Sequence, residues 1–170
     1  GTTHMLELAR QSAGVRFLQM SSGSVYGPPP GGVGSLAERF DGTADHRDPR
    51  QRFGAAKRRA EQAGEAAVAQ GVAFVSARAF ALVGPRLPLD AAFALGNFLG
   101  DALAGRSIRI NSDGTVERSW LHMADLTAWC WTLLARGVPG RAYNVGAAES
   151  MSLWEAAHRV ARLPAPPVTG

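Results

Sequence analysis

The order of two apolar runs and the helix between them constrains the fold of this chain most strongly. Residues 15–20 (V-R-F-L-Q-M) and 72–80 (V-A-F-V-S-A-R-A-F) are short runs rich in strand-forming residues. Residues 54–70 are Ala-rich, carry Glu and Arg, and are followed by Gly71, which indicates a helix and its end. A strand, a long loop, a helix and a second strand predict a parallel βαβ unit with a right-handed crossover. The chain is therefore expected to be an α/β protein.

The rest of the chain predicts further elements around this unit. The Ser-, Gly- and Pro-rich stretch 21–34 is expected to be a loop. Parallel sheets are normally buried on both faces and contain more than two strands, so the chain is expected to be part of a larger domain. Periodicity predicts helices over the first residues up to Gly14 and over 90–104, 124–136 and 152–162, and short strands near 107–110 and at 117–121 and 142–145.

Composition and charge disfavour several classes of protein. The chain is 46% hydrophobic and 19% charged, which argues against disorder, and no apolar run approaches the roughly 20 residues that span a bilayer. The net charge is +4, and all but one of the 18 basic residues are arginines. They are scattered, with no basic stripe, so a GC-rich coding background explains them better than nucleic-acid binding does.

The numbers and positions of cysteine and histidine residues bear on metal binding and on the cellular compartment. Four histidines far apart in the sequence disfavour a metal site. A single cysteine, Cys130, and the lack of a signal-peptide pattern fit a reducing cytoplasm.

Two short segments carry candidate chemistry. Residues 21–27 read S-S-G-S-V-Y-G and follow the first predicted strand. A serine at the carboxyl end of a parallel strand points into the crevice where α/β sheets bind ligands; equally, the segment fits a turn that satisfies its own backbone. Residues 53–57 read F-G-A-A-K, open the long helix and contain the only lysine, Lys57.

With these segments the chain resembles the extended short-chain dehydrogenases/reductases, in the NAD-dependent epimerase/dehydratase family that acts on nucleotide sugars. In that family a strand ends in S-S-x-x-V-Y-G and a helix then begins with Y-G-x-x-K. Lys57 falls on the lysine of this motif. The likeness runs from residue 1 to about residue 162 and includes R-A-F-A-L-V-G-P at 78–85, L-P-L-D at 87–90, G-N-F at 96–98, D-G-T-V-E-R at 113–118, D-L at 125–126 and Y-N-V-G at 143–146.

The resemblance implies a domain organisation and a cofactor. Residues 1–82 would be the C-terminal part of a dinucleotide-binding domain, with a partial Rossmann-like parallel sheet and flanking helices. Residues 83–170 would form mainly a small α/β region that binds the nucleotide sugar, with one or more elements returning to the main sheet. The implied cofactor is NAD, with NADP as the alternative.

The resemblance also implies a set of site residues. Ser22 would hydrogen-bond the reacting hydroxyl, Lys57 would hold the nicotinamide ribose, and Arg118 would grip the diphosphate. The catalytic set is Ser22, Phe53 and Lys57; the cofactor contacts are Ser21, Lys57 and Phe80; the substrate contacts are Ser22, Tyr26, Asn97 and Arg118; no metal is implied.

One departure from the family pattern concerns the cofactor. Members carry a G-x-x-G-x-x-G turn that cradles the pyrophosphate at a helix N-terminus, before the point where this chain starts. This sequence does not contain that turn, and the usual C-terminal helices are not there either. Both ends are therefore expected to be cut, so the chain alone is expected to be inactive. It is expected to pair with a second copy or with the missing half.

The other departures concern the chemistry. Phe53 stands where the family has a tyrosine that removes the sugar hydroxyl proton, its pKa lowered by the lysine. Loss of such a base costs about 10²–10⁴-fold, so impaired redox chemistry is expected. Gly23 and Ser24 stand where 4,6-dehydratases carry an Asp-Glu pair, which favours 4-epimerisation, reduction or decarboxylation over 4,6-dehydration. The alternative is a non-catalytic nucleotide-sugar binding or interaction module. Neither nucleic acid nor membrane is an expected partner.

Overall fold

The computed structural model describes residues 1–28, 36–40, 42–91 and 93–164. The chain divides into two compact units, one formed by Gly1–Phe80 with Ala124–Gly146 and the other by Ala81–Met123 with Ala147–Gly170. Each unit has strands and helices of its own. Among the described residues, no helix has the length and apolar character needed to cross a membrane.

A three-stranded parallel sheet in the order β1-β2-β6 forms the centre of the first unit. Ser22 lies opposite Ala79, so the carboxyl ends of the first two strands meet at the same edge of the sheet. The third strand pairs with the second from Ser76 to Ala79. The strands are β1 (Arg16–Ser22), β2 (Ala73–Ala79) and β6 (Ala142–Val145).

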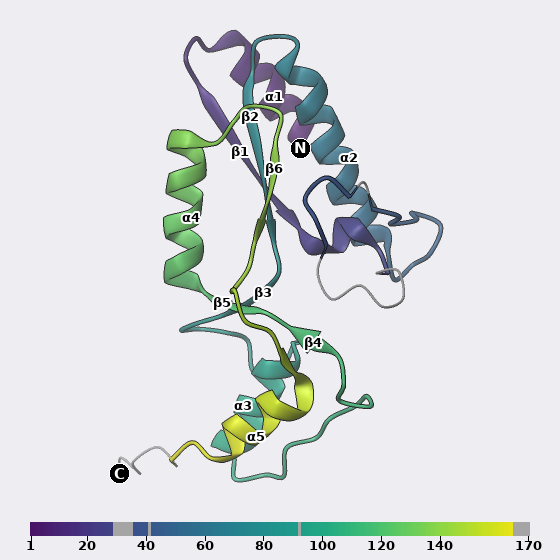
Figure 1. Cartoon of the computed structure of the whole chain (residues 1–170), viewed down its shortest axis with the longest axis vertical. Helices are drawn as coiled ribbons and strands as arrows, with labels where there is room; N and C mark the ends of the chain where they lie inside the picture. The colour runs from purple at the N-terminus through teal and green to yellow at the C-terminus, as the bar shows by residue number, and fades with distance from the viewer. Residues whose placement is uncertain (29–35, 41, 92, 165–170) are drawn as a thin grey trace. The chain divides into compact units, whose positions relative to one another are not determined.

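Helices cover both faces of this sheet. Two of them, α1 (Thr2–Gln11) and α2 (Arg52–Val68), lie on one side, and α4 (Met123–Arg136) lies on the other (Figure 1). Phe74 of β2 packs against Gly64 of α2, where an added Cβ atom would collide with the phenyl ring. The same apolar cluster includes Leu6 of α1. Burial of these side chains fixes the two helices on the sheet.

The second unit contains two short two-stranded sheets and two packed helices. β3 (Ala81–Val83) pairs in parallel with β5 (Trp120–His122), and β4 (Glu117–Arg118) pairs antiparallel with β7 (Met151–Ser152). The helices are α3 (Ala94–Leu103) and α5 (Leu153–Ala161), and the core between them is built around Phe98, Ala157 and Val160.

The prediction of an α/β fold with a partial Rossmann-like parallel sheet is confirmed. Several boundaries were wrong. The expected strand near 107–110 is absent from the described residues, and the expected strand 117–121 is split into β4 and β5. The expected loop 21–34 begins with the last residues of β1 and a short 3-10 helix, η1 (Gly23–Tyr26). The strand expected at 142–145 is β6, which joins the two strands of the βαβ unit as a third strand.

Candidate functional site

The candidate site is built at the carboxyl end of β1, where the strand turns into η1. Ser22 is half-buried, and its Oγ accepts a hydrogen bond from the backbone N–H of Ser24 at 3.2 Å. The Ser22 hydroxyl also donates to Ser24 Oγ at 3.1 Å. The turn therefore orients the Ser22 hydroxyl through its own backbone and through its neighbour.

The N-terminal turn of α2 is held against η1 by a close backbone approach. Gly54 is buried, and an added Cβ atom there would collide with the carbonyl oxygen of Ser24. Only glycine allows the helix to approach the turn so closely. This approach brings the start of α2, with Phe53 and Lys57, to the end of β1.

Phe53 and Lys57 lie together at this helix start. The Phe53 side chain is 58% exposed, and Lys57 Nζ lies 5.7 Å from the centroid of its ring. Lys57 Nζ also donates a hydrogen bond to the carbonyl oxygen of Met20 in β1 at 2.7 Å. An ammonium group has three donors, so the bond to Met20 does not use the full donor capacity of Lys57.

The Phe80 ring packs against η1 at Gly23 and Tyr26. A Cβ atom added to Gly23 would lie 2.5 Å from Phe80 Cε1, so the ring occupies the space that a side chain at position 23 would need. The Phe80 ring also stacks on Tyr26, with centroids 6.4 Å apart. Phe80 is 37% exposed, so it is not fully enclosed by the first unit.

Two of the residues predicted to contact ligands are buried in this structure. Tyr26 is fully buried, and its hydroxyl donates to Asn144 Oδ1 at 2.6 Å and accepts from Arg78 Nη1 at 2.8 Å, so its side chain belongs to the core of the first unit. Ser21 is buried as well. Its contact with a cofactor stays a prediction.

A buried ion pair lies beneath the site and was not predicted from the sequence. Arg78 Nη2 lies 2.8 Å from Glu61 Oε2, and Arg78 Nε donates to Glu61 Oε1 at 3.0 Å. Burial raises the pKa of Glu61, but the hydrogen bonds it accepts and the positive charge of Arg78 together hold this pKa below its ordinary value. One feature of the sequence could have indicated this pair: Arg78 is a charged residue inside the apolar run 72–80, and a buried charge needs a partner.

Arg78 and Asn144 also fasten the segment that follows η1. Arg78 Nη1 donates to the Glu38 carbonyl oxygen at 2.9 Å, and the Asn144 backbone N–H donates to the Glu38 carboxylate at 2.9 Å. Asn144 Nδ2 donates to the Leu36 carbonyl oxygen at 2.8 Å. Strands β2 and β6 thereby position both η1 and the 36–38 segment.

The remaining predicted residues belong to the second unit. Asn97 is half-buried on α3, and its backbone N–H donates to the carbonyl oxygen of Phe93. Arg118 is exposed on β4, and its Nη1 donates to the carbonyl oxygen of Glu117 at 2.8 Å. In the described part of the chain, no hydrogen bond joins Asn97 to Arg118.

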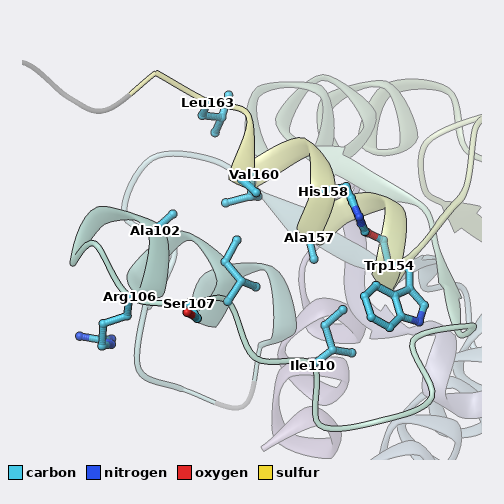
Figure 2. A pocket seen from close by; sticks show the side chains of 11 residues that line it. Ala102, Arg106, Ser107, Ile110, Trp154, Ala157, His158, Val160 and Leu163 are labelled. Atoms are coloured by element: carbon cyan, nitrogen blue, oxygen red, sulfur yellow. The ribbon is translucent and has the colours of Figure 1, made fainter.

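A cavity of about 460 Å³ also lies in the second unit. It is lined by the end of α3, the 106–110 segment and α5, with Trp154 and His158 side by side at one end (Figure 2). None of the predicted site residues lines it. Within the described residues, no group of three or more His, Cys, Asp or Glu side chains is arranged to hold a metal ion.

Comparison with known proteins identifies one family. The model of the NAD dependent epimerase/dehydratase family matches residues 1–146. UDP-glucuronic acid decarboxylase 6 of Arabidopsis thaliana is 30% identical over 169 residues, which cover 99% of this chain and 48% of that protein. The chain thus spans about half the length of the curated relatives that it matches.

Solved structures show the same fold. dTDP-glucose 4,6-dehydratase from Bacillus anthracis, in complex with NAD, superposes with a TM-score of 0.83 and 22% identity, covering 94% of this chain and 49% of that chain. A tyrosine-to-phenylalanine mutant of UDP-glucuronic acid 4-epimerase from Bacillus cereus, in complex with UDP-4-deoxy-4-fluoro-glucuronic acid and NAD, gives 0.77 and 24%, covering 90% and 46%. At these identities the likeness is one of fold.

Proposed function

Because this chain belongs to the NAD-dependent epimerase/dehydratase family, we propose that it serves NAD-dependent chemistry on a nucleotide sugar. The first unit would contact the nicotinamide end of the cofactor, and the second would bind the nucleotide through Asn97 and Arg118. NAD, when bound, supplies a hydride acceptor for the sugar carbon. NADP remains the alternative cofactor.

The observation that carries this proposal is the grouping of Ser22, Phe53 and Lys57. The approach of Gly54 to Ser24 brings the start of α2 to the end of β1, where α/β sheets bind their ligands. In the proposed site, Ser22 donates to or accepts from the reacting hydroxyl, and Lys57 holds the ribose with the donors that Met20 leaves free.

The environment of Gly23 narrows the class of reaction. Neither Gly23 nor Ser24 has a carboxyl group, and the Phe80 ring fills the space beside Gly23. The turn therefore lacks the acid and base that an elimination needs at this position. We favour 4-epimerisation, reduction or decarboxylation over 4,6-dehydration, and the similarity to a UDP-glucuronic acid decarboxylase supports a UDP-sugar substrate.

Phe53 limits the chemistry of the protein as it stands. The ring fills its place but has no proton to exchange, so we expect the Phe53→Tyr variant of the complete gene product to turn over its UDP-sugar about 10²–10⁴-fold faster. The assay is NADH formation or sugar epimerisation. Phe53→Leu, which adds no hydroxyl, is the matched control and is expected to show no gain.

A non-catalytic nucleotide-sugar binding module is the second candidate. Phe53 favours it, because the residue whose ring Lys57 contacts has no phenol whose pKa the lysine could lower. In this case UDP-sugar binds equally to the Phe53 and Phe53→Tyr forms, and neither form turns it over. Under either candidate we propose that the chain assembles with a second copy or pairs with the half of the family fold that carries the pyrophosphate turn.

A further inference from the structure

We propose that Trp154 is a positioning residue for Arg118, because it holds the 112–118 segment in the shape that presents this arginine to a nucleotide diphosphate. The inference rests on the proposed function, which gives Arg118 its role. Trp154 is the second residue of α5 and is 50% exposed. Its side chain is not a member of the apolar cluster between α3 and α5. It contacts Asp113 and Gly114 instead.

The indole of Trp154 binds this segment in two ways. Its Nε1 donates a hydrogen bond to the carbonyl oxygen of Asp113 at 2.8 Å. Its ring also lies against Gly114, where an added Cβ atom would collide with it. Gly114 has a φ of +75°, a conformation that favours glycine, so the turn is shaped both by its own backbone and by the ring that covers it.

The backbone at the start of α5 holds the same segment. The N–H of Trp154 donates to the Gly114 carbonyl oxygen at 3.1 Å, and the N–H of Leu153 donates to the Val116 carbonyl oxygen at 3.1 Å. Arg118 itself lies opposite Met151 in the β4–β7 pair. The chain leading to Arg118 is therefore fastened to α5 and β7 from Asp113 onward.

The side chain of His158, one turn further along α5, contacts the indole of Trp154. The imidazole of His158 lies 5.8 Å from the Trp154 ring, tilted by 45°, and His158 Nδ1 is hydrogen-bonded to the Trp154 carbonyl oxygen at 2.8 Å. Figure 2 shows the two side chains next to each other on α5. An arginine on a fastened segment loses less conformational freedom when it binds a phosphate than one on a free loop.

The test is calorimetric titration of UDP into the 170-residue chain, as wild type, Trp154→Phe, Arg118→Ala and the double variant. Trp154→Phe removes the indole N–H but keeps an aromatic ring, and we expect it to weaken UDP binding about fivefold, because the loosened segment then loses more conformational freedom when Arg118 binds a phosphate. In the Arg118→Ala background it is expected to cause no further loss. Uridine, which has no diphosphate, is expected to bind Trp154→Phe and wild type equally.

Two further variants complete the design. Trp131→Phe alters a 70% exposed tryptophan on α4 and is the matched control, expected to leave UDP binding unchanged. Gly114→Ala disturbs the same contact from the opposite side and is expected to reproduce the Trp154→Phe pattern.

The outcomes separate this inference from the function on which it rests. Additive losses in the double variant, or an equal loss for uridine, overturn the role of Trp154 and leave Arg118 in the site. Unchanged UDP binding in Arg118→Ala, or no UDP binding by the wild type, overturns the proposed nucleotide site and the role of Trp154 with it.

Discussion

Glu61 and Arg78 carry opposite charges in a part of the first unit that water does not reach. Two polar contacts join their side chains, and Arg78 also donates to Tyr26 and to the Glu38 backbone. Removing one member of such a pair leaves the other charge buried without compensation. The pair is therefore the residue-scale feature on which the shape of the site depends most.

We expect Glu61→Gln to lower the free energy of unfolding by about 3–5 kcal/mol, because it leaves Arg78 charged and without its carboxylate. The measurement is urea-induced unfolding of the 170-residue chain. Glu155→Gln is the matched control: Glu155 pairs with Arg159 at the exposed surface of α5, and its loss is expected to cost at most about 1 kcal/mol. Equal costs for the two variants would show that the buried pair is not special.

The same pair predicts a dependence of stability on pH. The pKa of Glu61 is lowered in the folded chain, so the unfolded state binds the proton more readily. Its contribution to stability is complete above the unfolded carboxyl pKa, about 4.3, and is lost as pH falls through the lower folded pKa. Glu61→Gln is expected to flatten the acid limb of the curve of stability against pH.

At the scale of elements, the contact between α2 and η1 decides whether the site exists. Alanine in place of glycine normally stabilises a helix by about 1 kcal/mol, but at Gly54 the added methyl group meets the Ser24 carbonyl oxygen. We expect Gly54→Ala to destabilise the chain by about 1–3 kcal/mol, as overpacking does. A gain in stability, measured in the same unfolding assay, would contradict the close approach. Ala56→Gly, on the exposed side of α2, measures the helix-propensity effect alone.

Helices and strands with a clear local pattern can be predicted from the sequence. Short strands that exist only because a neighbouring strand pairs with them cannot. The Ala-rich helix and the two apolar strands of the βαβ unit were recognisable because their patterns are local. Ile108 and Ile110 alternate as in a strand, but their side chains pack on the α3–α5 cluster. Alternation indicates a buried face and does not show whether a neighbouring strand offers hydrogen bonds.

The candidate site shows the same division. Phe53 and Lys57 were identified from a motif in one short segment, and the structure places them in contact. The burial of Tyr26 depends on Arg78 and Asn144, which are 52 and 118 residues away in the sequence. The sequence pattern around Tyr26 holds no trace of those partners, so its role in the core became visible only in the structure.

At the scale of the whole molecule, the sequence lacks the G-x-x-G-x-x-G turn for the pyrophosphate. In the proposed site Lys57 holds the ribose of NAD, but no such turn binds the pyrophosphate. We therefore expect the 170-residue chain not to bind NAD with micromolar affinity. Isothermal titration with NAD is the measurement. A micromolar dissociation constant would mean that the pyrophosphate is held by other residues of this chain.

The proposed function depends most on Lys57 being placed to lower the pKa of a tyrosine introduced at position 53. Its most direct test is the pH profile of kcat/KM for the complete gene product carrying Phe53→Tyr, with and without Lys57→Met. We predict that the lysine holds the apparent pKa of the new tyrosine well below the ordinary value of about 10, and that Lys57→Met returns it toward that value. A profile that Lys57→Met leaves unchanged, or no turnover in the Phe53→Tyr form, would contradict the claim.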